Sequence, residues 1–442
     1  MFQSRLYFVL WTTLVWNTVL NGEEPVSFRS QIAPILLENC LACHGPKKAE
    51  GGYRLDTFNE MLKAGDSGES PVVASDPATS ELLNRLVTED HSIRMPAESE
   101  ALLPEQIELV RRWIAAGASF DGDKADEALL TVIPPLTYAN APASYAQSLP
   151  VTALAFSPDQ SQVISSGYHE LLVWNVSDGK LARRISNLGQ TVYAIRFLPD
   201  GKTIAVACGD PGVRGEVRLI EFATGSLIKV VARSSDVVLD IAARPQSPQL
   251  AACGADGMIR IVKTDDYTEV RTIASHADWV TGVAWSDDGT RLASASRDKS
   301  VKVFDGESGE LLFSYTGHGM PVRSAVFAPD GKTIFSAASD HQLHRWAVAD
   351  GAKVAGVGVG GEAFQLVRSG DSVWGTSTDR NVRLVTGANN AVAKTLAGHQ
   401  DWVLSLALSA DAKLLASGSL DGEIRLWNCE DGAMKAQWFA KP

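Results

Sequence analysis

The chain has 442 residues, of which 45% are hydrophobic and 21% are charged, a composition typical of globular proteins and not of disordered ones. Its formal net charge is −12, and its acidic residues are scattered, so nucleic acid and anionic lipid are disfavoured as partners. The length is sufficient for two or three domains.

The N-terminus predicts an export signal over residues 1–22. Arg5 precedes an apolar stretch from Leu6 to Leu20, which small or polar residues follow. The alternative is an uncleaved membrane anchor, but fifteen residues that include Asn17 fall short of the ~20 apolar residues that a span needs. We therefore expect cleavage near Gly22, a periplasmic or other extracytoplasmic location, and no membrane association after cleavage.

The next region, residues 23–120, contains the motif Cys40-Leu41-Ala42-Cys43-His44. CxxCH is an attachment motif for c-type haem, because two thiols one helical turn apart can add to the two vinyl groups of the porphyrin and the adjacent His then lies under the iron. A zinc site would need a second pair of ligands, and a thioredoxin-like redox pair would need a βαβ pattern, which is absent. The motif predicts one covalently attached haem c, with His44 as the proximal iron ligand.

A second axial ligand to the iron is expected after the motif, and the candidates are Met61, His91 and Met95. Met95 is favoured because it precedes Pro96, which holds it extended in a loop, and because a helix follows. His91 is the chief rival. Ligation by methionine would close the iron to exogenous ligands, which favours electron transfer over oxygen chemistry.

Helices are expected on both sides of the motif. Apolar residues recur at helical spacing at Phe28, Ile32, Ile35 and Leu36, and again at Ile107, Val110 and Ile114. Pro34 predicts a boundary or kink in the first helix, and Gly117 is placed to cap the second. The segment from Glu23 to Lys124 has 10 basic and 18 acidic side chains, so one hypothesis is an acidic docking face for a basic redox partner.

With these features, the region from about Ser27 to Phe120 resembles the planctomycete-type cytochrome c domain. The resemblance rests on Asn39 to Gly45, Gly51-Gly52-Tyr53-Arg54-Leu55-Asp56, Gly65-Asp66-Ser67-Gly68, Arg94-Met95-Pro96 and Arg111-Arg112-Trp113-Ile114-Ala115-Ala116-Gly117-Ala118. It implies that Cys40 and Cys43 are the thioether positions, His44 the proximal ligand and Met95 the distal one. Family members often have a second proline after Met-Pro, where this chain has Ala97.

A Pro/Ala-rich stretch, residues 121–148, is predicted to be a linker, and residues 149–442 are repetitive. Aspartates recur at Asp256, Asp298, Asp340, Asp379 and Asp421, with separations of 42, 42, 39 and 42 residues. A period of ~40 to 45 residues with four short strands per unit indicates a propeller blade. Seven units fit, starting near Pro150, Thr191, Val237, Val280, Val322, Ala363 and Val403.

Three of these units resemble the WD-repeat family, because each has His, Ser, Asp and an aromatic residue at offsets of 18, 22 and 28. The sets are His276, Ser294, Asp298, Phe304; His318, Ser336, Asp340, Trp346; and His399, Ser417, Asp421, Trp427. The resemblance implies that each set forms a buried hydrogen-bonded network, so these histidines are interpreted as structural. The other units keep only part of the set: Trp174 in the first, Asp256 in the third and Asp379 in the sixth.

Two further features of the repeats are interpreted structurally or as contacts. Cys208, Cys253 and Cys429 are expected to be small buried hydrophobes, because equivalent positions of neighbouring blades are too far apart to bridge. The second unit has an insertion, Gly209 to Gly215, which is predicted to be a loop on one rim and a candidate contact surface.

The predicted architecture is multidomain: a small all-α cytochrome c-like haem domain followed by an all-β seven-bladed WD-repeat β-propeller. The predicted function is an exported electron carrier and not an enzyme, with a redox partner protein and a protein partner on the propeller. One alternative is a WD-repeat interaction scaffold whose haem is structural or accessory. Another is a haem enzyme or ligand sensor, which Met95 ligation and the lack of G-x-S-x-G and H-E-x-x-H motifs disfavour.

Overall fold

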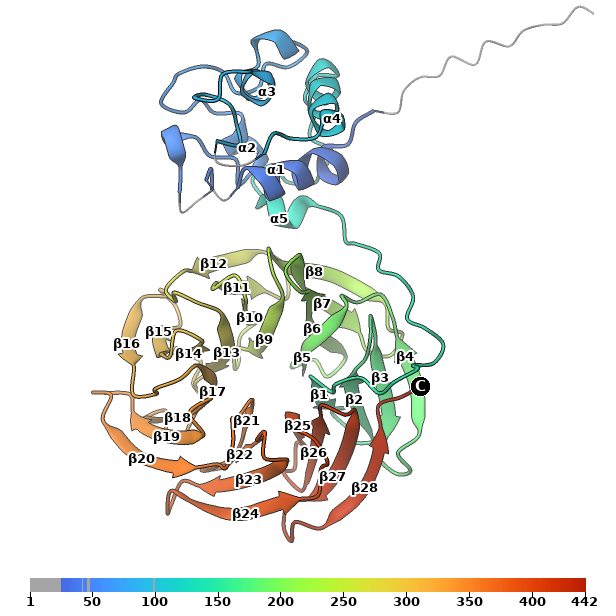
Figure 1. Cartoon of the computed structure of the whole chain (residues 1–442), viewed down its shortest axis with the longest axis vertical. Helices are drawn as coiled ribbons and strands as arrows, with labels where there is room; N and C mark the ends of the chain where they lie inside the picture. The colour runs from blue at the N-terminus through green and yellow to red at the C-terminus, as the bar shows by residue number, and fades with distance from the viewer. Residues whose placement is uncertain (1–24, 42, 46–47, 98–99) are drawn as a thin grey trace, which may run out of the picture. The chain divides into compact units, whose positions relative to one another are not determined.

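The computed structural model describes residues 25–41, 43–45, 48–97 and 100–442 (Figure 1). The predicted export signal, residues 1–22, lies outside the described residues. The chain divides into two compact units, the first ending at Asp126 and the second running from Glu127 to Pro442. Within the described ranges, no helix is both long and apolar enough to cross a membrane.

The first unit consists of short helices joined by loops. They are η1 (Phe28–Ile32), α1 (Ala33–Asn39), η2 (Glu50–Gly52), α2 (Phe58–Met61), η3 (Pro77–Thr79), α3 (Glu81–Val87) and α4 (Pro104–Ala115). Both predicted helices are present, and the break predicted at Pro34 falls where the π-helical turn η1 passes into α1. The sequence analysis did not predict α2 and α3, because each is too short to show a helical period.

An aromatic cluster forms the core between η1, α2 and α4. The Phe28 ring lies 4.9 Å from Phe58 and 5.4 Å from Trp113, and Phe58 lies 4.9 Å from Phe120. Gly117 ends α4 as predicted: its φ is +103°, and its N–H bonds to the Ile114 carbonyl at 2.9 Å. The apolar stripe of α4 is thereby fixed against η1 and the cluster.

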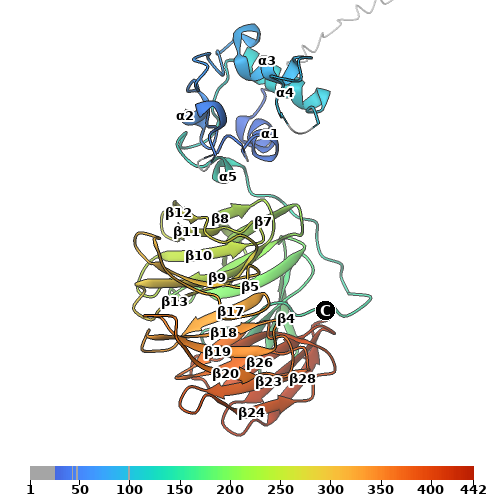
Figure 2. The same ribbon diagram turned by 60° about the vertical axis from the view of Figure 1, so that its left-hand side comes forward.

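The second unit begins with α5 (Leu129–Val132) and then forms a ring of seven four-stranded antiparallel sheets (Figures 1 and 2). Blades 1 to 3 are β1 (Leu154–Phe156), β2 (Gln162–Ser166), β3 (Leu171–Asn175), β4 (Leu181–Ile185); β5 (Thr191–Phe197), β6 (Thr203–Asp210), β7 (Arg214–Glu221), β8 (Leu227–Ser234); and β9 (Val238–Ala243), β10 (Gln249–Gly254), β11 (Ile259–Lys263), β12 (Glu269–Ile273). Blades 4 and 5 are β13 (Val280–Trp285), β14 (Arg291–Ser296), β15 (Val301–Asp305), β16 (Leu311–Tyr315); and β17 (Val322–Phe327), β18 (Thr333–Ala338), β19 (Gln342–Ala347), β20 (Lys353–Gly358). Blades 6 and 7 are β21 (Leu366–Ser369), β22 (Ser372–Gly375), β23 (Asn381–Thr386), β24 (Ala391–Ala397); and β25 (Val403–Leu408), β26 (Leu414–Ser419), β27 (Glu423–Asn428), β28 (Met434–Phe439).

The predicted seven-bladed β-propeller is therefore confirmed, and each blade uses four consecutive strands. In Figure 1, the first strand of each blade lies nearest the centre of the ring. The ring closes where blade 1 meets blade 7: the Val151 N–H donates to the Ser419 carbonyl at 3.0 Å, and the Ser405 hydroxyl donates to the Val151 carbonyl at 2.6 Å. Closure thus depends on contacts between two complete blades and not on a blade shared between the ends.

The insertion in blade 2 was predicted as a loop, and this prediction is wrong. Strands β6 and β7 extend through it, with Gly209 opposite Gly215, so only a short turn remains. Glycine is required at Gly215, because a Cβ atom there would lie 2.3 Å from the Asp236 carbonyl oxygen. Because Gly215 has no side chain, the longer hairpin can lie against the start of blade 3. A sequence pattern of Gly and Pro does not distinguish such a hairpin from a loop.

Residues 134–145 lie along blades 1 and 2, and we call them the strap. Arginines of the blades donate to strap carbonyl groups: Arg233 to Pro134 at 3.0 Å, Arg218 to Leu136 at 2.7 Å, and Arg184 to Pro142 at 2.6 Å and Ala143 at 2.9 Å. The buried carboxylates Glu216 and Glu170 pair with these arginines at 2.6 to 3.1 Å. The charges of the arginines are therefore compensated while their remaining N–H groups hold the strap.

Candidate functional site

Cys40, His44 and Met95 line one cavity of the first unit. The empty space of the cavity, counted out to its open mouth, is about 880 Å³. Its other lining residues are Glu50, Gly51, Tyr53, Leu55, Gly65, Ser67, Glu69, Pro71, Glu81, Leu82, Arg85 and Leu86. The segments that carry the family resemblance near Cys40, Gly51, Gly65 and Met95 therefore converge on this cavity.

The motif forms a tight turn at the end of α1. The N–H groups of Cys43 and His44 both donate to the Cys40 carbonyl, at 3.2 and 3.0 Å, so the turn returns His44 towards Cys40. Burial, together with the nearby Cys43, raises the pKa of the Cys40 thiol to about 12. Cys43 is half-buried on the same turn, and Ala42 lies outside the described residues.

The His44 ring is held by the main chain. Its Nδ1 atom lies 3.3 Å from the Tyr53 carbonyl oxygen, which can only accept a hydrogen bond. A proton on Nδ1 leaves the lone pair of the neutral imidazole on Nε2, which is the arrangement of histidine ligands to metals. The Leu55 N–H donates to the His44 carbonyl at 2.9 Å and fixes the same segment from the other side.

Two glycine-containing segments form the wall beside His44. The Asp66 N–H donates to the Gly51 carbonyl at 2.7 Å. A Cβ atom on Gly65 would lie 2.5 Å from that carbonyl oxygen and 3.0 Å from the Cβ of Tyr53. The segment that carries Tyr53 can therefore lie this close only because residue 65 is glycine.

The three candidate distal ligands lie in different places. Met95 lines the cavity, and its N–H donates to the Arg85 carbonyl at 2.9 Å, which ties the loop to α3. Met61 is fully buried in α2 and does not line the cavity, and His91 is exposed and also absent from its lining. The structure thus brings Met95, and neither alternative, to the cavity that His44 lines.

Sequence reasoning missed the contribution of α3. Glu81, Leu82, Arg85 and Leu86 all line the cavity, and their spacing places them on one face of this helix. The available signal was weak, because α3 has only seven residues. Cys43 is not among the described lining residues, and its thiol lies on the adjoining turn. With leucines, the Cys40 thiol, the His44 imidazole and the Met95 thioether on the wall, the site fits an iron porphyrin.

In the propeller, the predicted networks form in blades 4 and 5. The His318 ring bonds to Asp340 and Ser336, both at 2.8 Å, and His276 bonds to Asp298 at 2.7 Å and Ser294 at 2.6 Å. Burial lowers the pKa of both histidines. The predicted hydrogen-bonded networks of these two histidines are confirmed.

The network of blade 7 differs from its prediction. His399 bonds to Ser417 at 2.7 Å as expected, but its Nδ1 lies 2.9 Å from Glu423 and not beside Asp421. Glu423 has the longer side chain and extends from β27 to the ring, while Asp421, in the turn before β27, accepts from Ser419 at the end of β26. A spacing rule cannot separate two carboxylates that lie two residues apart.

Blade 5 contains a group of three possible metal ligands, His318, Asp340 and His344. The two imidazole rings are stacked, with centroids 4.0 Å apart and planes 9° apart, so their in-plane lone pairs cannot point to one ion. The ring of His344 also contacts Tyr315 at 3.0 Å and Lys353 at 2.8 Å. These contacts favour a packing role for the group.

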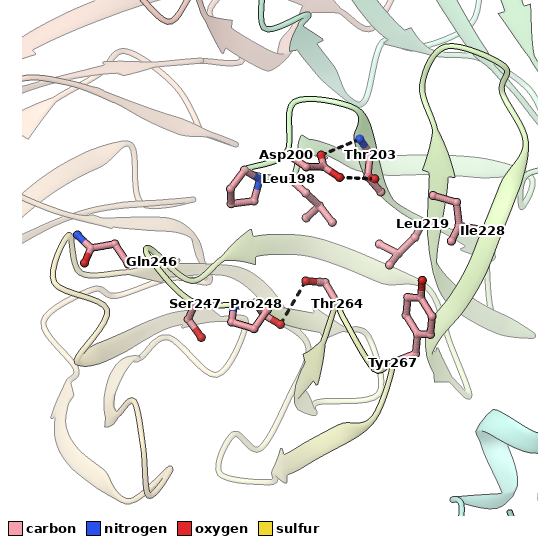
Figure 3. Close-up of a pocket in the computed structure, with 11 residues that line it drawn as sticks. Leu198, Asp200, Thr203, Leu219, Ile228, Gln246, Ser247, Pro248, Thr264 and Tyr267 are labelled. Carbon is pink, nitrogen blue, oxygen red and sulfur yellow. Dashed lines mark hydrogen bonds between the residues drawn. The ribbon is translucent and has the colours of Figure 1, made fainter.

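A second cavity lies in the propeller, between blades 2 and 3 (Figure 3). It is lined by Leu198, Pro199, Asp200, Thr203, Leu219, Ile228, Gln246, Ser247, Pro248, Thr264 and Tyr267. Two pairs of its polar groups bond to each other: Asp200 accepts from Thr203, and the Thr264 hydroxyl donates to the Pro248 carbonyl. We assign no chemistry to this cavity.

The remaining cysteines are unpaired. Cys208 and Cys253 are buried and Cys429 is partly buried, in agreement with their interpretation as packing residues. Burial raises the pKa of Cys208 to about 12 and that of Cys429 to about 11. Neither thiol is a reactive thiolate at neutral pH.

Comparison with known families matches both units. Residues 40–99 match the family Planctomycete cytochrome C, and residues 143–175, 267–305, 309–346 and 390–428 match the WD domain, G-beta repeat. Each of the last three matches runs from the outer strand of one blade through the first three strands of the next. The sequence repeat is therefore offset by one strand from the structural blade.

Curated relatives share short segments with this chain. Intraflagellar transport protein 122 homolog of Mus musculus is 29% identical over 102 residues, which cover 23% of this chain and 8% of the relative. Eukaryotic translation initiation factor 3 subunit I of Neosartorya fischeri is 34% identical over 71 residues, covering 16% of this chain and 21% of the relative. The chain spans less than a quarter of the length of either relative. The chain therefore joins a segment of the planctomycete cytochrome C family to a seven-bladed WD-repeat propeller.

Proposed function

We propose that the chain is an exported c-type cytochrome that carries one covalent haem and transfers electrons, while its propeller docks a protein partner. The observation that carries this proposal is the convergence of Cys40, His44 and Met95 on one cavity with leucine side chains in its wall. Membership of residues 40–99 in a cytochrome family supports it. Export rests on the signal pattern of residues 1–22, and cleavage is tested by N-terminal sequencing of the mature protein.

Each residue of the site has a distinct part in this proposal. Cys40 and Cys43 would hold the haem covalently: each S–H group would add across one vinyl group, with sulfur bonding to one carbon and hydrogen to the other. His44, oriented by the Tyr53 carbonyl, offers Nε2, and Met95, tethered to α3, offers its sulfur. A bound haem supplies the one-electron couple of its iron.

The two axial residues distinguish electron transfer from oxygen chemistry. If His44 and Met95 both bound the iron, it would have no open position for a substrate. The protein then acts by ligation and burial, and it needs no general base at the site. An iron ligated by protein on both sides favours an electron carrier over a haem enzyme or a ligand sensor.

The decisive experiment is an absorption spectrum of protein made in a host that matures c-type cytochromes. We expect haem that resists acid–acetone extraction, a pyridine haemochrome spectrum of the c type, and an oxidised band near ~695 nm from methionine ligation. Attached haem without this band would favour the sensor or enzyme. Absence of attached haem, with a C40S/C43S variant as the matched control, would contradict the proposal.

An interaction scaffold is the second candidate, and the four WD-repeat matches favour it. WD-repeat propellers have many protein partners, and the fold alone does not establish function. A strain that carries Met95→Leu separates the two candidates. If this strain has the same phenotype as a strain that lacks the gene, electron transfer is supported. If it has the same phenotype as the wild type, the scaffold is supported.

A further inference from the structure

We propose that Arg85 binds a carboxylate of the cofactor in the cavity of Cys40, His44 and Met95, namely a propionate of the haem. This inference rests on the proposed function, because it needs a haem in that cavity. Three independent observations support it: the place of Arg85 on the wall, the N–H groups of its side chain that remain available, and the negative charge of the other ionisable wall residues.

Arg85 lies beside the predicted distal ligand. Its main-chain carbonyl accepts the Met95 N–H at 2.9 Å, while its side chain lines the cavity. The side chain is 32% exposed, so it lies between the buried leucines of α3 and solvent. A porphyrin is largely apolar and has two polar carboxylates, so its ring would be buried and its carboxylates would lie in this region near solvent.

The guanidinium of Arg85 is held in place by two contacts, and some of its N–H groups remain unused. Its Nε donates to Glu81 at 2.7 Å, one turn earlier on α3, and its Nη1 lies 3.5 Å from the Ile93 carbonyl. No described residue accepts a hydrogen bond from Nη2. An oriented guanidinium with unused N–H groups matches the planar fork that carboxylates bind.

The other ionisable side chains on the described wall, apart from Cys40, His44 and Tyr53, are Glu50, Glu69 and Glu81. A haem would add two more carboxylates to this wall, and like charges in a partly buried site repel each other. Among the described lining residues, Arg85 has the one guanidinium or ammonium group. We therefore infer that it bridges Glu81 and a propionate.

The test is the midpoint potential of the haem in a double-mutant cycle. Reduction adds an electron, so a nearby cation favours the reduced form and Arg85→Gln lowers the potential, while Glu81→Gln raises it. We expect Arg85→Gln to reduce the equilibrium constant for reduction about tenfold, which is about 59 mV for one electron. The double variant Glu81→Gln/Arg85→Gln decides the matter.

If Arg85 also binds a propionate, the potential of the double variant stays below that of the wild type. If Arg85 neutralises only Glu81, removing both charges restores the wild-type potential and overturns the proposal. Arg85→Lys keeps the charge without the fork and should give an intermediate potential. The matched control is Glu108→Gln/Arg111→Gln, an exposed pair at 3.4 Å on α4, which should leave the potential unchanged.

A second measurement does not depend on the folding of any variant. In a crystal structure of the haem-loaded wild type, an Arg85 Nη atom within hydrogen-bond distance of a propionate supports the proposal, and separation from both propionates overturns it. Wild-type protein without attached haem contradicts both this inference and the proposed function. Attached haem with a wild-type potential in the double variant contradicts this inference alone.

Discussion

The guanidinium of Arg218, in β7, donates a hydrogen bond of 2.7 Å to the main-chain oxygen of Leu136, 82 residues earlier in the chain. Arg218 is fully buried, and it also donates to the Asn187 carbonyl at 2.7 Å and to Glu216 at 2.8 Å. These hydrogen bonds bind the Pro/Ala-rich segment to the propeller, and Tyr145, at its end, is also buried in the hydrophobic core of blades 1 and 7. Polar contacts and the burial of Tyr145 together fix the strap.

Replacing Arg218 should release the strap. Arg218→Leu removes three hydrogen bonds and leaves Glu216 with only Arg233 as its ion-pair partner, so the free energy of unfolding should fall by about 3 kcal/mol. Limited proteolysis should then cut within residues 134–145. Arg214→Gln, which removes a partly exposed pair of 3.3 Å to Asp210 in the same blade, is the control and should leave the strap protected.

Met95 should determine the spectrum of the haem-loaded protein. Met95→Leu removes the thioether, so the ~695 nm band should disappear and the potential should fall. Met61→Leu is the control: this residue is fully buried away from the cavity, and the change should lower stability by less than about 1.5 kcal/mol without altering the band. Absence of the band from the wild type, or its retention in Met95→Leu, would contradict the assignment.

The ion pair of Asp256 and Arg260 should be important for blade 3. The two side chains are 7% and 11% exposed and lie 2.6 Å apart. Arg260→Leu leaves the buried carboxylate unpaired and should cost about 3 to 5 kcal/mol in chemical denaturation. Asp256→Asn/Arg260→Leu should recover part of this loss.

The control for this pair lies in the same blade. Lys263 and Asp266 form an exposed pair at 3.2 Å, so Lys263→Ala should change the free energy of unfolding by no more than about 1 kcal/mol. Equal losses in Lys263→Ala and Arg260→Leu would show that burial of the ion pair is unimportant.

Acid should weaken the propeller between about pH 6.5 and pH 4. Burial lowers the pKa of His344 and of His399 from 6.5 to about 4, so between these values the unfolded chain binds more protons than the folded one. Stability therefore falls as pH falls, by up to about 1.4 kcal/mol per pH unit for each histidine. Urea denaturation followed by tryptophan fluorescence at several pH values measures this slope.

His344→Gln should reduce the slope by about one proton. The control is His341→Asn, at an exposed position of the same blade where φ is +65°, because asparagine tolerates this backbone conformation. An unchanged slope in His344→Gln would exclude His344 as a source of the acid sensitivity.

The sequence by itself determined the features that depend on local spacing. The CxxCH turn, the helix cap at Gly117 and the repeat period are short-range patterns, and they predicted the turn at Cys40, the end of α4 and the seven blades. The networks of His276 and His318 also followed, because their spacing reflects a fixed register between neighbouring strands.

Only the tertiary structure showed which residues bind the corresponding aspartates in blades that lack this histidine. In blades 3 and 6, Asp256 and Asp379 pair with Arg260 and Arg383, four residues later. Both pairs are visible in the sequence, but a spacing of four residues does not reveal whether two side chains on a strand and its turn meet. Burial decides this, because an aspartate removed from water needs a partner.

Tertiary structure also decided the walls of the candidate site. Arg85 reaches Met95 and the cavity from a helix that is too short to show a periodic pattern. The strap is held by arginines that are distant in sequence: Arg233 donates to the Pro134 carbonyl, 99 residues earlier. Hydrogen bonds between a side chain and a distant carbonyl group carry no sequence spacing. They exist only once the strands and helices that carry them have packed.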